Sequence, residues 1–308
     1  MEGILSFLPN RISDILEQIP SIEKENMEEI RVRINRPLEV TIRGLPKFLS
    51  YIVTPEDAVQ LLNKLSNFSM YTLEEELQRG YITIAGGHRV GLAGKVILEG
   101  GKVKAIREIA SFNIRVAREK VGISEQLLPF IYNGKAWRHT MIIGPPQTGK
   151  TTLLRDIARL VSGGINNQNI PPLKAGIIDE RSEIAGCVNG IPQLTFGPRV
   201  DVLDSCPKAE GMMMMIRSMS PDVLIVDEIG RQEDAEAIME AVNAGIKLII
   251  TTHGNTFSDI MKRPILKPIL ESEIFERFIE LNRDEGPGTV ASIKNEMGTK
   301  MDHKVRVT

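Results

Sequence analysis

The stretch from Gly144 to Thr151, GPPQTGKT, has the spacing of a loop that binds phosphate groups. In such a loop, backbone N–H groups and the N-terminus of the following helix surround phosphate oxygens, a lysine neutralises the terminal phosphates, and a hydroxyl holds Mg²⁺. The lysine would be Lys150 and the hydroxyl that of Thr151. The predicted nucleotide-binding residues of this segment are Gly144, Pro145, Pro146, Gln147, Thr148, Gly149, Lys150, Thr151 and Thr152.

The residues on both sides of the loop support this interpretation, which a short motif needs because it also arises by chance. Residues 140–143, TMII, predict a buried strand directly before the loop. After it, apolar residues recur at helical spacing at positions 153, 154, 157, 158 and 161, and Gly163-Gly164 predicts the end of that helix. A strand, a phosphate loop and a helix in this order predict a nucleotide-binding domain.

Two further apolar runs each end in an Asp-Glu pair. ATP hydrolysis minimally requires one such acidic strand end beside the phosphate loop, so a second pair is more than the minimum. Residues 223–226, VLIV, lead into Asp227 and Glu228, and a shorter run leads into Asp179 and Glu180. Asp227 would hold Mg²⁺ through a water of its shell, and Glu228 would polarise the water that attacks the γ-phosphate. For the earlier pair, a solvated strand end is the alternative to an active-site role.

The stretch from Leu248 to Thr256, LIITTHGNT, predicts a buried strand that ends near His253. Ligands of open α/β sheets bind at the carboxyl ends of the strands, so the residues that follow all these strands should share one edge. His253 would then contact the γ-phosphate by a hydrogen bond, directly or through water. A histidine satisfied within the core is the alternative.

Composition limits the other function classes. The 308 residues are 42% hydrophobic and 25% charged, with a net charge of −2, so no global positive field attracts nucleic acid or anionic lipid. Aromatic residues make up 5% and there is no basic run, so we expect no nucleic-acid partner. Cys187 and Cys206 form no CxxC pair, which disfavours zinc. Without an apolar run of about 20 residues or a signal sequence, a cytoplasmic location is expected.

The chain divides into two predicted domains. Residues 1–117 should form a small α+β domain, residues 118–137 a linker, residues 138–295 an α/β nucleotide-binding domain, and residues 296–308 a polar, disordered tail. In the first domain, helical spacing extends over residues 4–19, and residues 28–44 alternate like two strands that turn at 35–37. Thr54 should cap a helix that begins at Pro55.

The order of these segments resembles that of the secretion-type ATPases, the ring motors of type II and type IV secretion and pilus retraction. The resemblance covers roughly residues 105–295, including REIASFNIRVAR, and implies a RecA-like P-loop ATPase domain with a mainly parallel sheet. It implies that Glu180 is the Asp-box carboxylate, often proposed as the general base, that Glu228 serves Mg²⁺, and that His253 senses the γ-phosphate. Four arginines would complete the site or couple it to subunit motion: Arg115, Arg118, Arg181 and Arg231.

Over nearly the whole chain, GGHRVGLAGKV, IGPPQTGKTTLLRD, DERSEIAG and GPGTVASI resemble the stage III sporulation protein AA family. This resemblance implies a Mg²⁺-dependent ATPase in the mother cell, a homo-oligomer and by resemblance a hexamer. It would energise a membrane-embedded channel complex during sporulation and lie at the membrane through protein partners. Secretion motors usually have Gly-Glu where this chain has Asp227-Glu228, which leaves the general base open between Glu180 and Glu228.

Two other function classes and the role of one methionine run stay open. A nucleic-acid-dependent RecA-like ATPase and a poorly hydrolysing, nucleotide-gated scaffold are the other function classes. The run from Met212 to Met215 predicts either flexible core packing or an adaptable contact with a neighbouring subunit.

Overall fold

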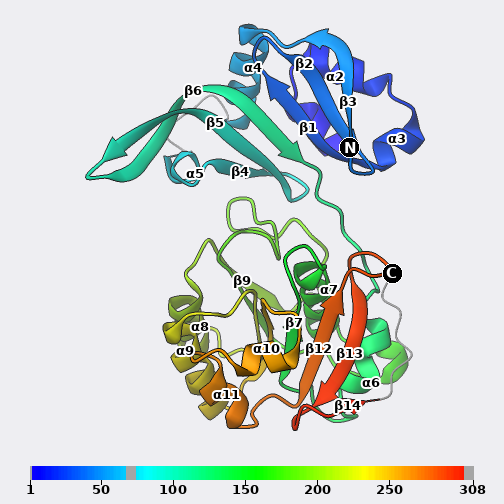
Figure 1. Ribbon diagram of the computed structural model, residues 1–308, viewed down its shortest axis with the longest axis vertical. Coiled ribbons are helices and arrows are strands. Elements are labelled where there is room, and N and C mark those ends of the chain that lie inside the picture. Colours follow the sequence, from blue (N-terminus) through cyan, green and yellow to red (C-terminus); the bar gives the residue numbers. More distant parts are fainter. Residues whose placement is uncertain (1, 67–73, 302–308) are drawn as a thin grey trace. The chain divides into compact units, whose positions relative to one another are not determined.

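The computed structural model describes residues 2–66 and 74–301, and the chain forms two compact units, residues 1–118 and 119–308 (Figure 1). Residues 119–137, which we expected to bridge two domains, lie within the second unit. Across the described residues, no helix combines the length and the apolar character that crossing a bilayer requires.

The first unit is built on a six-stranded sheet with the order β3-β2-β1-β6-β5-β4, in which all neighbouring strands are antiparallel. The strands are β1 (Met27–Arg33), β2 (Pro37–Ile42), β3 (Leu45–Ile52), β4 (Tyr81–Ile84), β5 (His88–Glu99) and β6 (Lys102–Arg115). The helices are α1 (Glu2–Phe7), α2 (Asn10–Glu17), α3 (Ser21–Glu25), α4 (Pro55–Leu65) and α5 (Glu74–Arg79).

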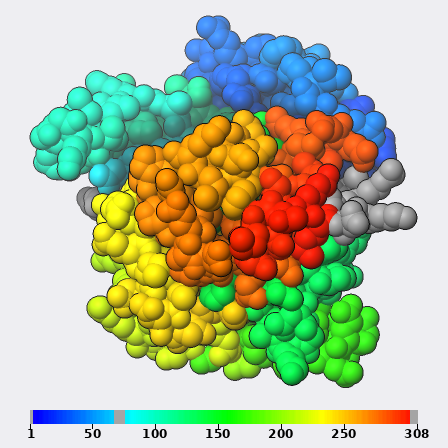
Figure 2. All heavy atoms as spheres, turned by 60° about the horizontal axis from the view of Figure 1, so that its bottom comes forward, coloured from blue at the N-terminus to red at the C-terminus, as the bar shows by residue number. Residues whose placement is uncertain are grey.

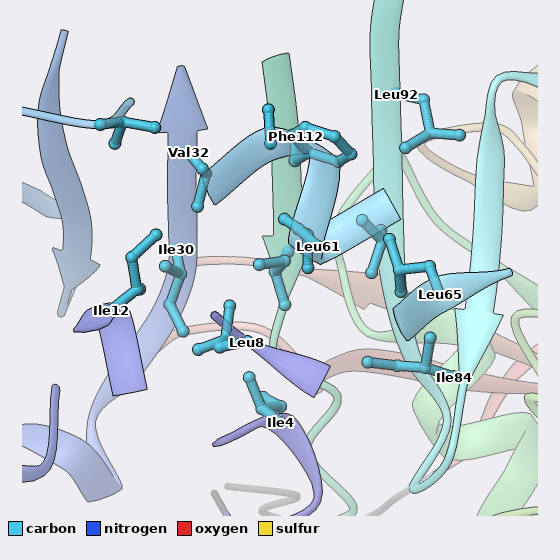
Figure 3. Packing of buried hydrophobic residues seen from close by; sticks show 14 of the residues in the cluster. Ile4, Leu8, Ile12, Ile30, Val32, Leu61, Leu65, Ile84, Leu92 and Phe112 are labelled. Carbon is cyan, nitrogen blue, oxygen red and sulfur yellow. The ribbon is translucent and has the colours of Figure 1, made fainter. Parts of the chain in front are cut away.

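The core of this unit joins the helices to one face of the sheet. Figure 3 shows Ile4, Leu8 and Ile12 from the N-terminal helices beside Ile30 of β1, and all four belong to one buried cluster. Residues 4–19, where the sequence predicted helical spacing, form parts of two helices. The break occurs because Pro9 has no N–H to donate and takes φ −55° and ψ 142° ahead of α2. Thr54 caps α4 in a capping box, as the sequence predicted.

The second unit contains an eight-stranded sheet with the order β14-β13-β12-β7-β11-β10-β8-β9. Neighbouring strands from β12 to β9 are parallel, whereas β13 and β14 are antiparallel to their neighbours. The strands are β7 (Thr140–Ile143), β8 (Ala175–Asp179), β9 (Val200–Asp204), β10 (Val223–Val226), β11 (Lys247–Thr252), β12 (Arg277–Asn282), β13 (Thr289–Asn295) and β14 (Lys300–Met301).

The short strand β14 lies inside the predicted polar tail. Its backbone pairs with β13 through Ile293 and Lys294, so the prediction of disorder is wrong for Lys300 and Met301. Residues 302–308 of that tail lie outside the described residues.

Helices cover both faces of this sheet. The helices α6 (Leu128–Ile131) and α7 (Lys150–Gly163) contribute to one buried cluster, together with the 3₁₀ turn Glu125–Leu127. A second cluster joins the opposite face to α8 (Lys208–Ser218), α9 (Gln232–Asn243), α10 (Phe257–Met261) and α11 (Lys267–Glu271). Figure 2 shows the yellow α8–α9 segment, the orange α10 and α11 and the red C-terminal strands on the surface of this unit.

The methionine run lies on α8. Met212 and Met215 are 0% and 1% exposed in the core, whereas Met214 is 47% exposed. The side chain of Met215 packs over Gly176 of β8, where a Cβ would come within 2.7 Å of its Cγ. Two of the four methionines in the run are therefore core residues.

Candidate functional site

The phosphate loop joins β7 to α7. Gly149 precedes α7 with φ 86°, a left-handed conformation that favours glycine, and among the described residues no side chain caps this helix N-terminus. Lys150 is 5% exposed, and its Nζ donates to the carbonyl oxygens of Gly144 (2.8 Å) and Pro145 (2.9 Å). Burial lowers the pKa of this ammonium group, while Asp227 and Glu228 oppose the shift. The loop and the helix end suit a phosphate group.

Thr151 and Asp227 meet across the sheet edge. The Thr151 hydroxyl donates to Oδ2 of Asp227 at 2.6 Å, and the Thr251 hydroxyl donates to Oδ1 of the same carboxylate. A hydroxyl and a carboxylate beside a phosphate loop are the oxygen ligands that Mg²⁺ takes in P-loop sites. The residues present therefore fit the magnesium ion that the sequence implies.

Glu228 is held in a single orientation by three contacts. Its backbone N–H donates to Thr251 Oγ1 at 2.8 Å. Its carboxylate lies 2.9 Å from Nε2 of His253 and 3.1 Å from a terminal nitrogen of Arg181. Its φ is +55°, a left-handed conformation that costs a non-glycine residue about 1–3 kcal/mol.

His253 lies between the phosphate loop and Glu228. Its Nδ1 is 3.3 Å from Nζ of Lys150, and its Nε2 is the atom that faces Glu228. The ammonium of Lys150 has only protons to donate, so Nδ1 accepts and Nε2–H donates. The imidazole is 40% exposed and faces these charged groups, so the alternative of a core histidine is not supported.

Asp179 supports the loop that follows β8. It is 2% exposed, and its carboxylate accepts backbone N–H groups of Glu183 (2.8 Å), Ile184 (3.0 Å) and Ala185 (2.8 Å). Burial raises the pKa of Asp179 to about 6 in spite of these donors. Arg155 of α7 donates to the carbonyls of Glu183 and Ile184 at 2.6 Å each, so the phosphate-loop helix also fixes this loop. The alternative of a solvated strand end does not hold for Asp179.

Glu180 pairs with Lys208, the first residue of α8. Both side chains line a pocket together with Asp179, Arg181, Glu183, Asp227 and Glu228. Sequence reasoning missed Lys208 because β9, which leads to α8, was not predicted. The alternation in VDVLD, residues 200–204, was the available signal.

Only one of the four predicted arginines lies in this pocket. Arg181 contacts Glu228, as described above. Arg115 is 3.6 Å from Glu29, and Arg118 donates to the Met27 carbonyl at 2.9 Å, so both make contacts inside the first unit. Arg231 is exposed at the N-cap of α9, outside the set of described residues that line the pocket.

A second set of contacts that the sequence did not predict braces the phosphate loop. Arg283, after β12, donates to the carbonyl oxygen (3.0 Å) and the Oε1 (2.7 Å) of Gln147. The backbone N–H of Gly288 donates to the Thr148 carbonyl at 2.8 Å. The turn between β12 and β13 therefore holds the middle of the loop, where Gln147 has a φ of 62°.

The parallel sheet, the phosphate loop and the carboxylates at one sheet edge define a RecA-like P-loop domain. The fold is similar to the X-ray structure of the Legionella pneumophila ATPase DotB, with a TM-score of 0.60 and 18% identity over 88% of this chain and 76% of that one. The pilus retraction motor PilT with bound ADP gives a TM-score of 0.59 and 17% identity, with the same coverage. The predicted fold class is confirmed.

The chain belongs to the family described as "Sporulation stage III, protein AA", whose model matches residues 1–301. A relative, the stage III sporulation protein AA of Bacillus subtilis (strain 168), is 58% identical over 307 residues, which are 100% of this chain and 99% of that protein. The resemblance predicted from the sequence motifs is confirmed.

Proposed function

We propose that this chain is a Mg²⁺-dependent ATP hydrolase that works as an oligomeric motor for a membrane-embedded channel complex during sporulation. The observation that carries the proposal is the 2.6 Å contact between Thr151 and Asp227. It places the hydroxyl of the phosphate loop against the carboxylate of a second strand, an arrangement suited to a nucleotide-bound Mg²⁺. The names of the relatives support the sporulation role and the motor class.

In this proposal each side chain has a defined role. Lys150 neutralises the β- and γ-phosphates, and Thr151 and Asp227 hold Mg²⁺, which stabilises the charge that develops on the phosphate oxygens. Glu180 or Glu228 orients and deprotonates the attacking water, and Glu228 is the candidate whose carboxylate contacts His253. His253 links Glu228 to Lys150 and is therefore placed to respond to the terminal phosphate.

The nucleotide-gated scaffold is a second candidate, and one observation favours it. Both carboxylates that could act as the base are paired with cations, Glu228 with Arg181 and Glu180 with Lys208. Each cation occupies part of the hydrogen-bonding capacity of its carboxylate, so all of that capacity becomes available to a water molecule only when the cation exchanges to another partner. Domain closure and subunit contacts would drive that exchange in a ring motor, with Arg115, Arg118 and Arg231 as further proposed participants.

Nucleotide binding and hydrolysis by the full chain test the proposal. We expect ATP hydrolysis that requires Mg²⁺, and we expect Lys150→Ala to abolish it and to weaken binding of a fluorescent ATP analogue. The matched control is Lys135→Ala, which removes an exposed lysine of the same unit. Binding without hydrolysis in the wild type would favour the scaffold, and equal binding by wild type and Lys150→Ala would refute the phosphate-site assignment.

A further inference from the structure

Lys208 is a partly buried cation that lines the pocket, and it lies outside every motif that predicted the site. Its ammonium group donates to Oε2 of Glu180, and the two side chains are 11% and 24% exposed. The pocket is lined by five carboxylates, those of Asp179, Glu180, Glu183, Asp227 and Glu228, and by the two cations Arg181 and Lys208. Arg181 contacts Glu228, and Lys208 contacts Glu180.

The fold delivers Lys208 to this position by a short route. β9 pairs in parallel with β8, so Asp204 lies opposite Asp179 at the same sheet edge. The backbone N–H of Ser205 donates to the Asp179 carbonyl at 2.8 Å, and Pro207 then starts α8 with Lys208 as its first residue. The chain therefore reverses direction after Asp204, and Lys208, the first residue of α8, contacts Glu180.

The first turn of α8 packs closely against β8. A Cβ on Gly211 would lie 2.7 Å from Cγ2 of Ile178, which is closer than side chains pack, and 3.1 Å from Sγ of Cys206, which is a tight contact. Glycine at this position therefore lets the first turn of α8 approach the strand that ends at Glu180. We expect the contact between Lys208 and Glu180 to depend on this approach.

We propose that Lys208 is a positioning residue for hydrolysis, which rests on the proposed function above. A lysine and a glutamate each lose considerable side-chain freedom when they are ordered, so each limits the rotamers of the other in a mostly buried pair. Lys208 thereby holds the Glu180 carboxylate in the pocket beside Asp227 and Glu228. It acts through Glu180 and not on the nucleotide.

Steady-state kinetics of the full chain test this role. Lys208→Met keeps the length and apolar stem of the side chain but removes its charge, and we expect kcat to fall at least about 10-fold while KM for ATP stays within about 3-fold. Lys208→Arg should restore most of kcat, because a guanidinium also donates to a carboxylate. The matched control is Arg217→Met, an exposed cation on the same helix, and it should leave kcat unchanged.

A double mutant separates positioning from other roles. In a Glu180→Gln background, Lys208→Met should lower kcat no further, because residues that act as a unit are not additive. If Lys208→Met lowers kcat by the same factor in the Glu180→Gln background as in the wild type, the inference is overturned. An unchanged kcat in Lys208→Met alone also overturns it. If Lys208→Arg is as inactive as Lys208→Met and both melt well below wild type, the role is structural, which also overturns it.

Gly211→Ala gives an independent test of the geometry. It displaces the first turn of α8 without changing any charge, and we expect the same loss of kcat with KM retained. A wild-type kcat in this variant would contradict the inference. Failure of the proposed function looks different, since wild-type protein would then show no Lys150-dependent turnover, whereas failure of this inference alone leaves that turnover intact.

Discussion

The imidazole of His253 joins Lys150 to Glu228, with Nδ1 3.3 Å from the ammonium nitrogen and Nε2 2.9 Å from the carboxylate. The ring therefore connects the phosphate-loop lysine to one of the two candidate bases. In the proposed function, a change at the γ-phosphate would move the Lys150 ammonium and so change the hydrogen bond that Nδ1 accepts. The ring would transmit that change to Glu228 through Nε2–H.

We expect His253→Ala to keep ATP affinity within a few-fold, because Lys150 and the loop amides supply the phosphate contacts. Turnover should fall sharply, since Glu228 loses one of the two groups that orient its carboxylate. Binding of a fluorescent ATP analogue and single-turnover hydrolysis measure the two effects separately. Normal turnover in the variant would show that Arg181 and Thr251 suffice to hold Glu228.

The two candidate bases are distinguished by charge-neutral variants. Glu180→Gln and Glu228→Gln should each lower kcat by at least ~10² with ATP still bound, because loss of a general base or of a charge that orients it costs this much. Steady-state hydrolysis together with ATP-analogue binding measures both. If one of the two variants hydrolyses ATP at the wild-type rate, the glutamate that it replaces is structural and the other glutamate is the general base.

Oligomer formation should depend on nucleotide. We expect a non-hydrolysable ATP analogue to increase the mass of the wild-type assembly, measured by light scattering over a range of protein concentrations, and not to do so for His253→Ala. In the proposed motor, a site completed by arginines of other segments would close only when the terminal phosphate is sensed. A wild type that stays monomeric with the analogue at every concentration would remove the main support for a motor.

Asp156 should link stability to pH. It is 3% exposed and accepts hydrogen bonds from Gly122 (3.0 Å), from the N–H (2.8 Å) and hydroxyl (2.6 Å) of Ser124, and from Arg159 (2.7 Å). Burial alone would raise its pKa, but the bonds from Arg159 and Ser124 outweigh burial and lower it. The stabilisation is therefore present above the unfolded-state pKa of about 4 and is lost as the pH falls through the lower folded-state pKa.

Asp156→Asn removes this pH-dependent term. We expect a loss of about 1–3 kcal/mol at pH 7, because the amide nitrogen faces groups that donate. The difference in Tm between wild type and variant should shrink as the pH falls below about 4. Glu236→Gln, an exposed carboxylate on α9, is the control. A Tm difference that does not change with pH would show that the ionised carboxylate is not the source of the stabilisation.

Gly197 is required by a close approach of two backbones. Its own N–H donates to the Ser162 hydroxyl at 2.9 Å, and a Cβ would lie 2.0 Å from the Gly163 nitrogen. Gly197→Ala should therefore cost at least about 2 kcal/mol, because backbone atoms at the end of α7 have to move. Gly230→Ala is the control, since its Cβ would meet no described atom within 4 Å. Thermal unfolding that is equal in the two variants would contradict this packing argument.

The sequence by itself determined the elements whose pattern is local. Residues 140–143 and 223–226 form the predicted strands, because a continuous apolar run requires burial on both faces wherever it is placed. The glycine spacing likewise determined the phosphate loop. The edge shared by Lys150, Asp227 and His253 followed from the general rule that parallel strands present their carboxyl ends together.

Only the tertiary structure decided which partners the charged side chains contact. Asp179 and Glu180 are adjacent and chemically alike, yet the first holds three backbone amides and the second meets Lys208. That difference depends on β9 lying beside β8 and on how closely α8 packs, and neither is recorded in a local pattern. Pairs such as Arg283 with Gln147 are 136 residues apart in the chain. Such contacts are set by strand order and backbone direction, which periodicity within one segment cannot specify.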